Sequence, residues 1–529
     1  MASIKFGIFI AVLMVFLSNA PRTAETSRIL TVAPFFGSSH TKFIQAVTLH
    51  LAKQGHDVTI ITSKPVKEPP PNYHQIIVNA EYYIKKFAEI NMWETKNHSF
   101  IHQVFTSWSH SVILQTEFFR CQTMADFIKN DQSQFDVVIV ELFYQEAMYM
   151  FAHKYKAPLV LIDTTFVKKH VEEIMGNPMP ASYVPYENFD VAGDFSIVKR
   201  FYNWFIGTVD YVGRTFHVSE QQNNLARKYF YSIPGPLPRV QDLQNSASLV
   251  LVNTHFSIDT VFPQVPGIVQ IGGAHIEEVK PLPKNIQKFL DEAVDGAIFF
   301  SLGSILKSST IPKYKIEAFL NVFKTLKQRV IWKWDDDEPP KQENLLTGKW
   351  FPQNDILAHP NVKAFISHGG MLSIQEAVDK GVPVIGIPVF SDQYLNMARL
   401  IERGSAIELD YLTISENTVR HVLDQVFNVS SYRQMAQELS IRFNDRQNSP
   451  LDSATYWIEY VIRHKGAPFI KSPWAHLAWY KKYMIDVILV AAALVGAIIG
   501  AIFYLRHLKH KKEDKKLAKL LLNQKFKKS

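Results

Sequence analysis

Cysteine is almost absent from this chain of 529 residues, since Cys121 is the only one. An intramolecular disulfide is therefore excluded, and a chain of this length can bury a core large enough to need none. Internal repeats are also absent, and low complexity is confined to the last two dozen residues, which excludes solenoid and fibrous architectures. We expect Cys121 to be an ordinary packed residue.

Net charge is also missing from most of the chain. The formal charge is +8, but residues 506–529 contain ten Lys or Arg and two acids, so this tail holds the whole excess. A neutral body with a basic tail does not provide the broad positive surface that binds nucleic acid. We therefore expect no nucleic-acid partner.

Two apolar segments predict a membrane protein of the secretory pathway. Lys5 precedes a short apolar run, Phe6 to Leu17, and small residues follow up to Ala20, as in a signal peptide over residues 1–20. Residues 484–505 are apolar except for Asp486 and are long enough to span a bilayer of roughly 30 Å. The aromatic side chains just before this run are typical of a membrane interface: Trp474, Trp479, Tyr480 and Tyr483.

The basic tail, residues 506–529, predicts the orientation. Positive residues favour the cytosolic side, so we expect a single-pass type I protein whose bulk is lumenal. Lys525 and Lys527 resemble a dilysine signal for retrieval to the endoplasmic reticulum. Asn97 and Asn428 begin sequons for lumenal glycosylation.

Short β runs alternate with helical stretches in both halves of the lumenal part, which predicts parallel sheets. We expect two facing Rossmann-like domains with a cleft between them, over residues 21–271 and 291–450, joined by a linker at 272–290 and followed by helices and a juxtamembrane segment at 451–483. The expected strands are Ile29–Ala33, Val58–Ile61, Val137–Val140, Leu159–Ile162, Leu249–Val252, Ala297–Leu302, Val330–Trp334, Val362–Ile366 and Val384–Ile387.

The stretch from Trp350 to Gln393 predicts a nucleotide-sugar site. An apolar strand at Ala364–Ile366 leads to Gly369-Gly370, a turn that brings backbone close to a ligand. A helix opens near Ser373, and the free N–H groups at its start suit a phosphate. Glu376 lies on the first turns of this helix, within reach of ribose hydroxyls.

This stretch resembles the signature of the UDP-glycosyltransferase family, which includes the UDP-glucuronosyltransferases and their insect and plant relatives. The similarity continues at Ser301-Leu302-Gly303-Ser304 and from Leu451 to Gly466. It implies a GT-B fold, a UDP-sugar as co-substrate, no permanently bound cofactor and no metal. The signal peptide, the membrane anchor and the lysine tail suit the membrane-bound animal branch, and several residues resemble its insect members.

The resemblance also implies residue roles. Trp350 should stack on uracil, Gln353 should help to hold the nucleoside, and Glu376 should bind the ribose. The residues expected at the diphosphate are Ser304, His368, Gly370 and Ser373, and those expected at the sugar hydroxyls are Asp392 and Gln393. Met371 and Leu372 depart from the polar or aromatic residues of many relatives, so they can offer only backbone groups.

His40 is the candidate general base. It ends the loop after the first strand, where the family carries its catalytic histidine, and imidazole suits proton transfer near neutral pH. His50 and His56 lie on or after the next helix and are expected at the surface.

The histidine needs a carboxylate to orient it and to stabilise its protonated form. Vertebrate relatives place an Asp after the corresponding strand, whereas this chain has Glu141 there. We expect Glu141 to be the partner of His40, with Glu146, Asp163 and Asp136 as alternatives.

The expected reaction is a single in-line displacement that inverts an α-linked donor to a β-glycoside. Glucose is favoured over glucuronate, because Gln264 stands where some glucuronate-using relatives have Arg and no cation follows Gln393 before Arg399. The Asp335-Asp336-Asp337 run has metal-binding spacing, but it precedes two prolines and suits a solvated loop better.

The expected acceptor is a small lipophilic molecule, because the first domain is rich in aromatic residues, which are Phe118, Phe119, Phe143, Tyr144, Tyr149 and Phe151. Two other readings stay open, a non-catalytic binding protein and a lipid-modifying transferase. Homo-oligomerisation also stays open.

Overall fold

The computed structural model describes residues 26–97, 99–187 and 195–526. The expected signal peptide and the last three residues, with Lys527, lie outside this part of the chain. Two compact units are present, one ending at Ser472 and the other beginning at Pro473. Each is described by itself.

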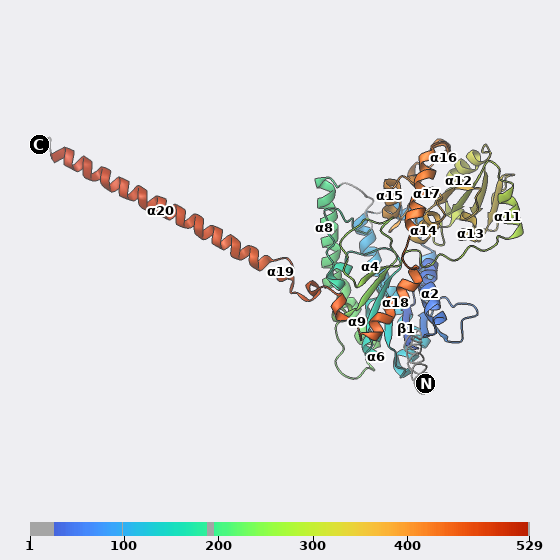
Figure 1. Ribbon diagram of the computed structural model, residues 1–529, viewed down its shortest axis with the longest axis horizontal. Coiled ribbons are helices and arrows are strands. Elements are labelled where there is room, and N and C mark those ends of the chain that lie inside the picture. Colours follow the sequence, from blue (N-terminus) through green and yellow to red (C-terminus); the bar gives the residue numbers. More distant parts are fainter. Residues whose placement is uncertain (1–25, 98, 188–194, 527–529) are drawn as a thin grey trace, which may run out of the picture. The chain divides into compact units, whose positions relative to one another are not determined.

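The first unit contains two parallel sheets (Figure 1). The first sheet has the order β3-β2-β1-β4-β5-β6-β7. Its central strands β4, β5 and β6 are completely buried and, apart from the acids that end β4 and β5, consist of Val, Ile and Leu, as expected when helices cover both faces. The strands are β1 (Arg28–Ala33), β2 (Asp57–Thr62), β3 (Tyr73–Ile77), β4 (Val137–Glu141), β5 (Leu159–Asp163), β6 (Leu249–Val252) and β7 (Ile268–Gln270).

The second sheet repeats this arrangement in the order β10-β9-β8-β11-β12-β13. In both sheets the chain starts in the middle, builds outward to one edge and then crosses to the other side, which is the Rossmann pattern. The strands are β8 (Ala297–Ser301), β9 (Arg329–Lys333), β10 (Leu345–Gly348), β11 (Val362–Ser367), β12 (Val384–Gly386) and β13 (Ala406–Glu408). The prediction of two Rossmann-like domains is confirmed.

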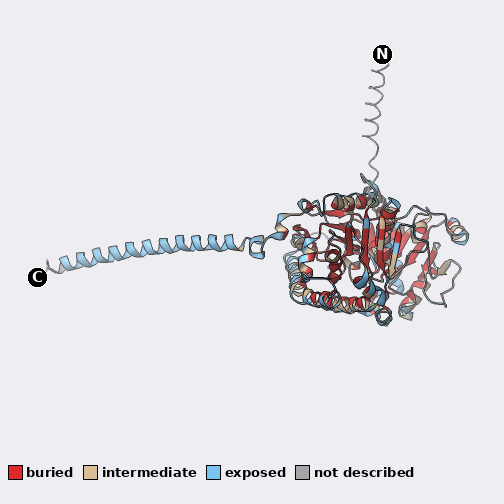
Figure 2. Cartoon of the chain, turned by 90° about the horizontal axis from the view of Figure 1, so that it is seen from below, coloured by how far each residue is buried: buried red, intermediate tan, exposed pale blue. Residues whose placement is uncertain are grey.

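Helices cover both sheets, and except for α8 most of their buried residues are apolar and face the sheets (Figure 2). Those of the first domain are α2 (Ser38–Lys53), α3 (Glu81–Ala88), α4 (Phe100–Arg120), α5 (Gln122–Asn130), α6 (Met150–Tyr155), α7 (Val171–Met175), α8 (Ile197–Gly213), the π-helix η3 (Arg214–Val218), α9 (Ser219–Tyr229) and α10 (Val240–Ser246). Those of the second are α11 (Lys284–Asp291), α12 (Lys313–Phe323), α13 (Gln353–Leu357), α14 (Met371–Asp379), α15 (Gln393–Glu402), α16 (Glu416–Asn428) and α17 (Ser430–Asn444).

One more helix, α18 (Pro450–Arg463), returns the chain from the second domain to the first. Its apolar residues Ala454, Ile458 and Val461 join the core beside α2. The return explains one wrong expectation. His56 is buried rather than at the surface, because its ring lies 3.2 Å from the Glu459 carboxylate of α18 and accepts a hydrogen bond from the Ser27 backbone N–H.

Two boundaries differ from those expected. Helix α2 begins at Ser38, so His40 lies in its first turn rather than at the end of a loop. Helix α11 begins within the segment expected as a linker and ends one residue after it, and its Ile286 and Leu290 pack into the core of the second sheet.

The second unit is helical. A short helix, α19 (Trp479–Lys482), precedes α20 (Ile485–Phe526). In the described part of the chain, α20 contains the one stretch, Ile485–Asn523, that is long and apolar enough to cross a membrane. It is exposed along its length (Figure 2). The expected span begins with this helix, and the helix continues into the basic tail.

Candidate functional site

A cavity of about 820 Å³ in the first unit is lined by residues from both domains. Its walls include the segments that follow β1 and β4 in the first sheet and β8 and β11 in the second. These are the carboxyl ends of the strands at which the order of each sheet reverses, the usual ligand position in open α/β folds.

His40 and Glu141 meet at the first of these positions. The Nδ1 atom of His40 hydrogen-bonds to Oε1 of Glu141, the last residue of β4, whose side chain is almost fully buried. Because an ionised carboxylate can only accept, Nδ1 carries the hydrogen and Nε2 is the nitrogen that can take up a proton. This is the orientation that a general base needs.

Two neighbours hold this pair. Thr164, directly after β5, places its hydroxyl 2.7 Å from Nδ1 of His40 and 3.3 Å from Oε1 of Glu141. Gln145 donates to the other carboxylate oxygen over 3.1 Å. Both Glu141 oxygens are therefore hydrogen-bonded, which is what a buried charge requires.

The alternative carboxylates are engaged elsewhere. Asp136 accepts from the Arg28 backbone at the opposite end of β4. Asp163 forms a buried ion pair with Lys168 over 2.5 Å. Glu146 faces Arg214 at 3.5 Å. The structure thus brings Glu141, and none of these three, to His40.

On the donor side, His368 is held between two glycines. A Cβ on Gly303 would lie 2.6 Å from Cε1 of His368, and one on Gly370 would lie 2.4 Å from its Nε2. Gly303 also has a φ of +76°, a conformation that favours glycine. Burial, together with the nearby Lys333 ammonium, lowers the pKa of His368 to about 4, so the ring is neutral at pH 7. Its Nδ1 is enclosed without a protein partner among the described residues.

Glu376 is the centre of a polar network that includes residues of both domains. Gln353 donates to its Oε2 over 2.7 Å and to the Ser373 hydroxyl over 3.1 Å. Lys42, in the first turns of α2, donates to its Oε1 over 2.8 Å. No pattern in the sequence indicates a role for Lys42, because its partner lies 334 residues away in the chain.

Trp350 and Lys333 lie together on the same wall of the cavity. The Trp350 side chain is 74% exposed, so its ring face is available to a planar ligand. The Lys333 ammonium lies 5.8 Å from the ring centroid and donates to the Gly303 carbonyl over 2.7 Å. Burial lowers the pKa of Lys333.

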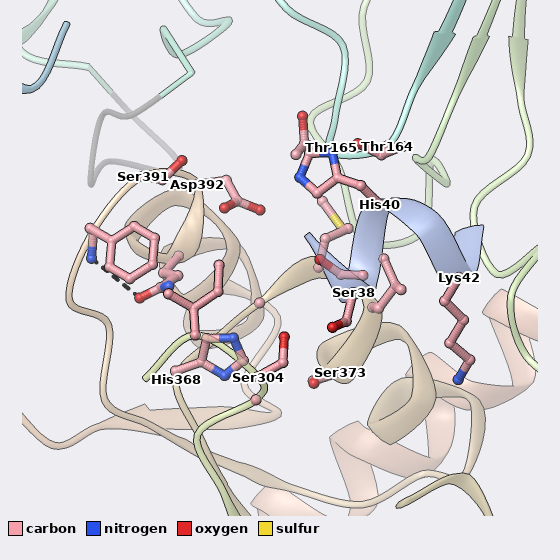
Figure 3. Close-up of a pocket in the computed structure, with 18 of the residues that line it drawn as sticks. Ser38, His40, Lys42, Thr164, Thr165, Ser304, His368, Ser373, Ser391 and Asp392 are labelled. Carbon is pink, nitrogen blue, oxygen red and sulfur yellow. Dashed lines mark hydrogen bonds between the residues drawn. The ribbon is translucent and has the colours of Figure 1, made fainter. Parts of the chain in front are cut away.

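Asp392 faces His40 across the cavity (Figure 3). Burial raises the pKa of Asp392, and the hydrogen bond from Asn396, 2.8 Å long, and the charge of His40 oppose that rise. The preceding residue, Ser391, adopts a φ of +59°, a strained conformation of the kind found at ligand sites.

Gln393 uses its side-chain oxygen within the protein. That oxygen accepts from the backbone N–H groups of Val389 and Phe390, over 2.9 and 3.2 Å. Its amide nitrogen can then serve as a donor in the cavity that Gln393 lines.

The structure thus brings every predicted site residue into the cavity region. Glu141 lies behind His40, and the other ten of the eleven line the cavity itself. These ten are His40, Ser304, Trp350, Gln353, His368, Gly370, Ser373, Glu376, Asp392 and Gln393. Sequence reasoning missed Thr164, Gln145, Lys42 and Lys333. A rule that tests polar residues at the ends of strands would have found Thr164.

The aromatic residues expected at the acceptor separate into two groups. Phe118, Phe119, Tyr149 and Phe151 belong to the core. Phe143 and Tyr144 line the cavity, and the ring of Phe143 lies 4.5 Å from that of His40. Helix α4 supplies more of the same wall through Gln103, Thr106, Ser107, His110, Ser111 and Leu114.

The acidic run that begins at Asp335 has a structural use. Asp335 accepts from the Ser308 backbone and the Ser309 hydroxyl, both over 2.9 Å, and Asp337 is exposed and paired with Lys349. Within the described ranges, no group of three His, Cys, Asp or Glu side chains is arranged to hold a metal ion.

Comparisons with known proteins agree with this geometry. Residues 28–517 match the family model described as "UDP-glucoronosyl and UDP-glucosyl transferase". The chain is 37% identical over 497 residues to UDP-glycosyltransferase UGT5 and 38% identical over 492 residues to UDP-glucosyltransferase 2, both of Dactylopius coccus. In each case the match covers 92% of this chain and 93% of the relative. UDP-glucuronosyltransferase 2B1 of Rattus norvegicus is 29% identical over 489 residues, covering 88% of this chain and 90% of the relative.

Solved structures of glycosyltransferases share the fold. CalG4, the calicheamicin glycosyltransferase, aligns with a TM-score of 0.57 at 16% identity, over 83% of this chain and 99% of its own. A UDP-glucosyltransferase from Polygonum tinctorium aligns with a TM-score of 0.54 at 15% identity, with the same coverage. These likenesses confirm the GT-B fold. The match across residues 28–517 shows that this chain belongs to the UDP-glycosyltransferase family and is a UDP-dependent glycosyltransferase.

Proposed function

We propose that this enzyme transfers glucose from UDP-glucose to a hydroxyl group of a small lipophilic acceptor, with His40 as the general base and Glu141 as its positioning carboxylate. One observation carries the proposal. His40, fixed through Nδ1 by Glu141 and Thr164, lines the same cavity as Asp392, His368 and the network around Glu376. A candidate base for an acceptor and polar groups suited to a UDP-sugar thus line one cavity.

In the proposed reaction, Nε2 of His40 removes the acceptor's hydroxyl proton as the acceptor oxygen attacks the anomeric carbon. The bond from that carbon to the phosphate oxygen breaks on the opposite face, so an α-linked donor gives a β-glycoside and UDP leaves. Glu141 stabilises the imidazolium that forms. The Ser304 and Ser373 hydroxyls and the first N–H groups of α14 bind the diphosphate, and the neutral His368 donates to it.

The remaining donor contacts in the proposal are those that the family resemblance implies, and they are assigned to side chains that line the cavity. Trp350 stacks on uracil, Gln353 holds the nucleoside, and Glu376 accepts from the ribose hydroxyls. Asp392 and the amide nitrogen of Gln393 bind the sugar hydroxyls. Gly370 leaves the space that the ring of His368 requires.

The choice of glucose rests on charge. A glucuronate carboxylate would need a cation, and three lysines line the described cavity. Each already has a protein oxygen as partner, since Lys42 bonds to Glu376, Lys333 to the Gly303 carbonyl and Lys280 to Glu277. Gln264 stands where some glucuronate-using relatives have Arg, and this difference also favoured glucose in the sequence. Gln264 is exposed, however, and is not among the residues lining the cavity, so it no longer supports the choice. The name of one Dactylopius relative, a UDP-glucosyltransferase, points the same way.

The acceptor class follows from the wall opposite the donor residues. Phe35, Phe87, Ile90, Leu114 and Phe143 make it apolar, and it includes few charged groups. A flat phenol, flavonoid or steroid suits such a surface. With the helix Ile485–Asn523 as anchor and the basic tail in the cytosol, the reaction would take place on the lumenal side of the endoplasmic reticulum membrane.

The test is product formation by the full chain in microsomes supplied with UDP-glucose or UDP-glucuronate and a panel of phenols, with detection by mass. We expect glucosides, and we expect His40→Ala to abolish them while leaving UDP binding unchanged. His50→Ala is the matched control, because His50 lies on the same helix but contacts Asp452 of α18. Glucuronides alone would overturn the donor choice. UDP binding without any product would indicate a non-catalytic binding protein, and normal activity of His40→Ala would refute the role of His40.

A further inference from the structure

Helix α8 buries polar side chains and exposes most of its large apolar ones. Its buried side chains are Asn203, Ile206 and Asp210, and the following Arg214 is also buried. Its exposed side chains are mostly large and apolar. They are Ile197, Val198, Phe201, Tyr202, Trp204, Phe205, Tyr211 and Val212, continued by Phe216 of the π-helix η3. A helix at the surface of a protein in water has the opposite arrangement.

The buried polar groups of α8 are satisfied, so the helix is held firmly in this orientation. Asn203 accepts from the Tyr186 backbone over 2.6 Å and donates to two carbonyl groups. Asp210 accepts from the Trp108 indole over 3.2 Å and from Arg214 over 2.9 Å. Turning α8 to hide its apolar face would break all of these bonds.

The exposed apolar side chains lie on one side of the helix. At 100° per residue, the positions from Ile197 to Val212 fall within one half of the helix circumference, opposite Asn203 and Asp210. Phe201 is 63% exposed, Trp204 54% and Phe216 75%. A continuous face of this size, rich in aromatic rings, marks an interaction site.

Helix α4 extends this face. Gly213 lies so close to Trp108 that a Cβ there would come within 1.9 Å of the indole, and Phe105 packs edge-on against Trp108 at 4.8 Å. Phe105 is half exposed, and Ile101 lies one helical turn before it. We call the exposed apolar side chains of α8, together with Phe216, Phe105 and Ile101, the apolar face.

We propose that the apolar face docks into the surface of the lipid bilayer in which this chain is anchored. The occupant follows from the chain itself, because its own membrane-crossing helix begins at Ile485, only 13 residues after the first unit ends at Ser472. A bilayer surface is therefore always close to this unit. Trp, Tyr and Phe are the residues that favour the boundary between headgroups and acyl chains.

The charges of α8 fit the same occupant. Its two exposed charged residues, Lys199 and Arg200, are both basic, and its single acid, Asp210, is buried. At 100° per residue, Arg200 lies beside the apolar half of the helix, whereas Lys199 lies on the opposite side, and a basic side chain beside an apolar face binds phospholipid headgroups. A second protein copy would give neither charge an opposite partner on this helix.

The docked face lies close to the acceptor wall. On α4, Ile101 and Phe105 belong to the apolar face, whereas Thr106, His110 and Leu114 line the cavity. One helix therefore separates the bilayer from the acceptor site. Lipophilic molecules that partition into the membrane would be concentrated next to that wall.

The docking can be measured without reference to activity. The full chain with Cys121→Ser has no cysteine, so Phe201→Cys adds a single labelling site for an environment-sensitive fluorophore. The labelled protein is placed in phosphatidylcholine nanodiscs that contain a nitroxide-labelled lipid. Ile441→Cys on α17 is the matched control, since Ile441 is also a strongly exposed apolar residue of a helix.

We expect the nitroxide lipid to quench the label at position 201 several-fold more than the label at position 441, and iodide in the buffer to quench it less. Equal lipid quenching at the two positions would overturn the proposal. Protection from iodide without lipid quenching would also overturn it, and would assign the apolar face to a contact between copies of the chain. Adding Phe205→Glu and Trp204→Glu to the labelled protein should abolish the lipid quenching at position 201.

Discussion

Glu141→Gln removes one charge from the site and leaves its shape almost unchanged. In the proposed mechanism His40 becomes positive as it takes the acceptor's proton, in direct contact with the Glu141 carboxylate. Two opposite unit charges about 4 Å apart attract by about 4 kcal/mol at an effective dielectric constant of about 20. Since about 1.4 kcal/mol corresponds to a tenfold change in rate, we expect kcat to fall about a thousandfold. That loss is within the range of roughly 10² to 10⁴ that general-base catalysis contributes.

The substitution should not disturb folding. The new amide nitrogen would meet the Gln145 amide, which now donates to the carboxylate over 3.1 Å. The Gln145 side-chain oxygen is buried and has no partner within the described residues, so a flip of that amide supplies the acceptor that the new N–H group needs. The Thr164 hydroxyl can still donate to an oxygen at position 141.

The assay compares single-turnover rates with UDP-glucose and the best acceptor of the microsomal panel, alongside UDP affinity. Glu141→Asp keeps the charge but draws it back by one methylene, so its rate should lie between those of the wild type and Glu141→Gln. Asp136→Asn is the control, because Asp136 precedes the same strand at the end far from His40. A rate for Glu141→Gln within a few-fold of wild type would refute the reasoning, provided that UDP binds normally.

Three further predictions concern the donor side. Gly370→Ala places a methyl group 2.4 Å from the His368 ring, and overpacking of about 1–3 kcal/mol should weaken UDP binding about tenfold or more in calorimetry; unchanged affinity would contradict the tight fit. Lys42→Met removes the cation paired with Glu376, so UDP, an anion, should bind a few-fold more weakly (~1 kcal/mol) while uridine is little affected; equal losses would point to a structural role only. Burial lowers the pKa of His275 to about 3, so the unfolded state binds its proton first as the pH falls below 6.5, and the free energy of unfolding should drop by about 2 kcal/mol by pH 5. His275→Gln should reduce that slope in urea unfolding, and an unchanged slope would exclude this histidine as its source.

The central strands could be predicted from the sequence because they are buried on both faces. Runs such as those of β4, β5 and β6 contain almost only Val, Ile and Leu, and the expected boundaries agree within a residue or two. The edge strands carried no such signal. Strand β3 mixes polar residues and is half exposed, β10 ends in Thr-Gly, and β7 and β13 have only three residues each. Hydrophobic periodicity cannot distinguish such segments from loops.

Several predicted residues of the candidate site follow central strands, although Thr164, which follows the central strand β5, was missed. His40 follows β1, Glu141 ends β4, Ser304 follows β8 and His368 follows β11, so the Rossmann order alone brings them to facing edges. The pairing of Lys42 with a residue 334 positions away, and of His56 with Glu459, could not be predicted. Such contacts depend on how the two domains and α18 pack against one another, and the hydrophobic periodicity of a single sequence does not indicate that packing.

Neighbouring residues of helix α14 connect donor binding to the relation between the domains. Gln375 is fully buried, donates to the Asn253 carbonyl of the first domain over 3.1 Å and accepts from the Gly273 backbone over 2.9 Å. The next residue, Glu376, turns into the cavity and reaches Lys42 of the first domain. A ribose bound to Glu376, as proposed above, would therefore contact the same helix turn that bonds to the first domain. The first domain carries His40 and the second carries the residues proposed to bind the diphosphate, so the distance between them depends on how the two domains are held together. In the proposed mechanism, the contacts of this turn with the first domain therefore help to set the geometry in which His40 meets the bound donor.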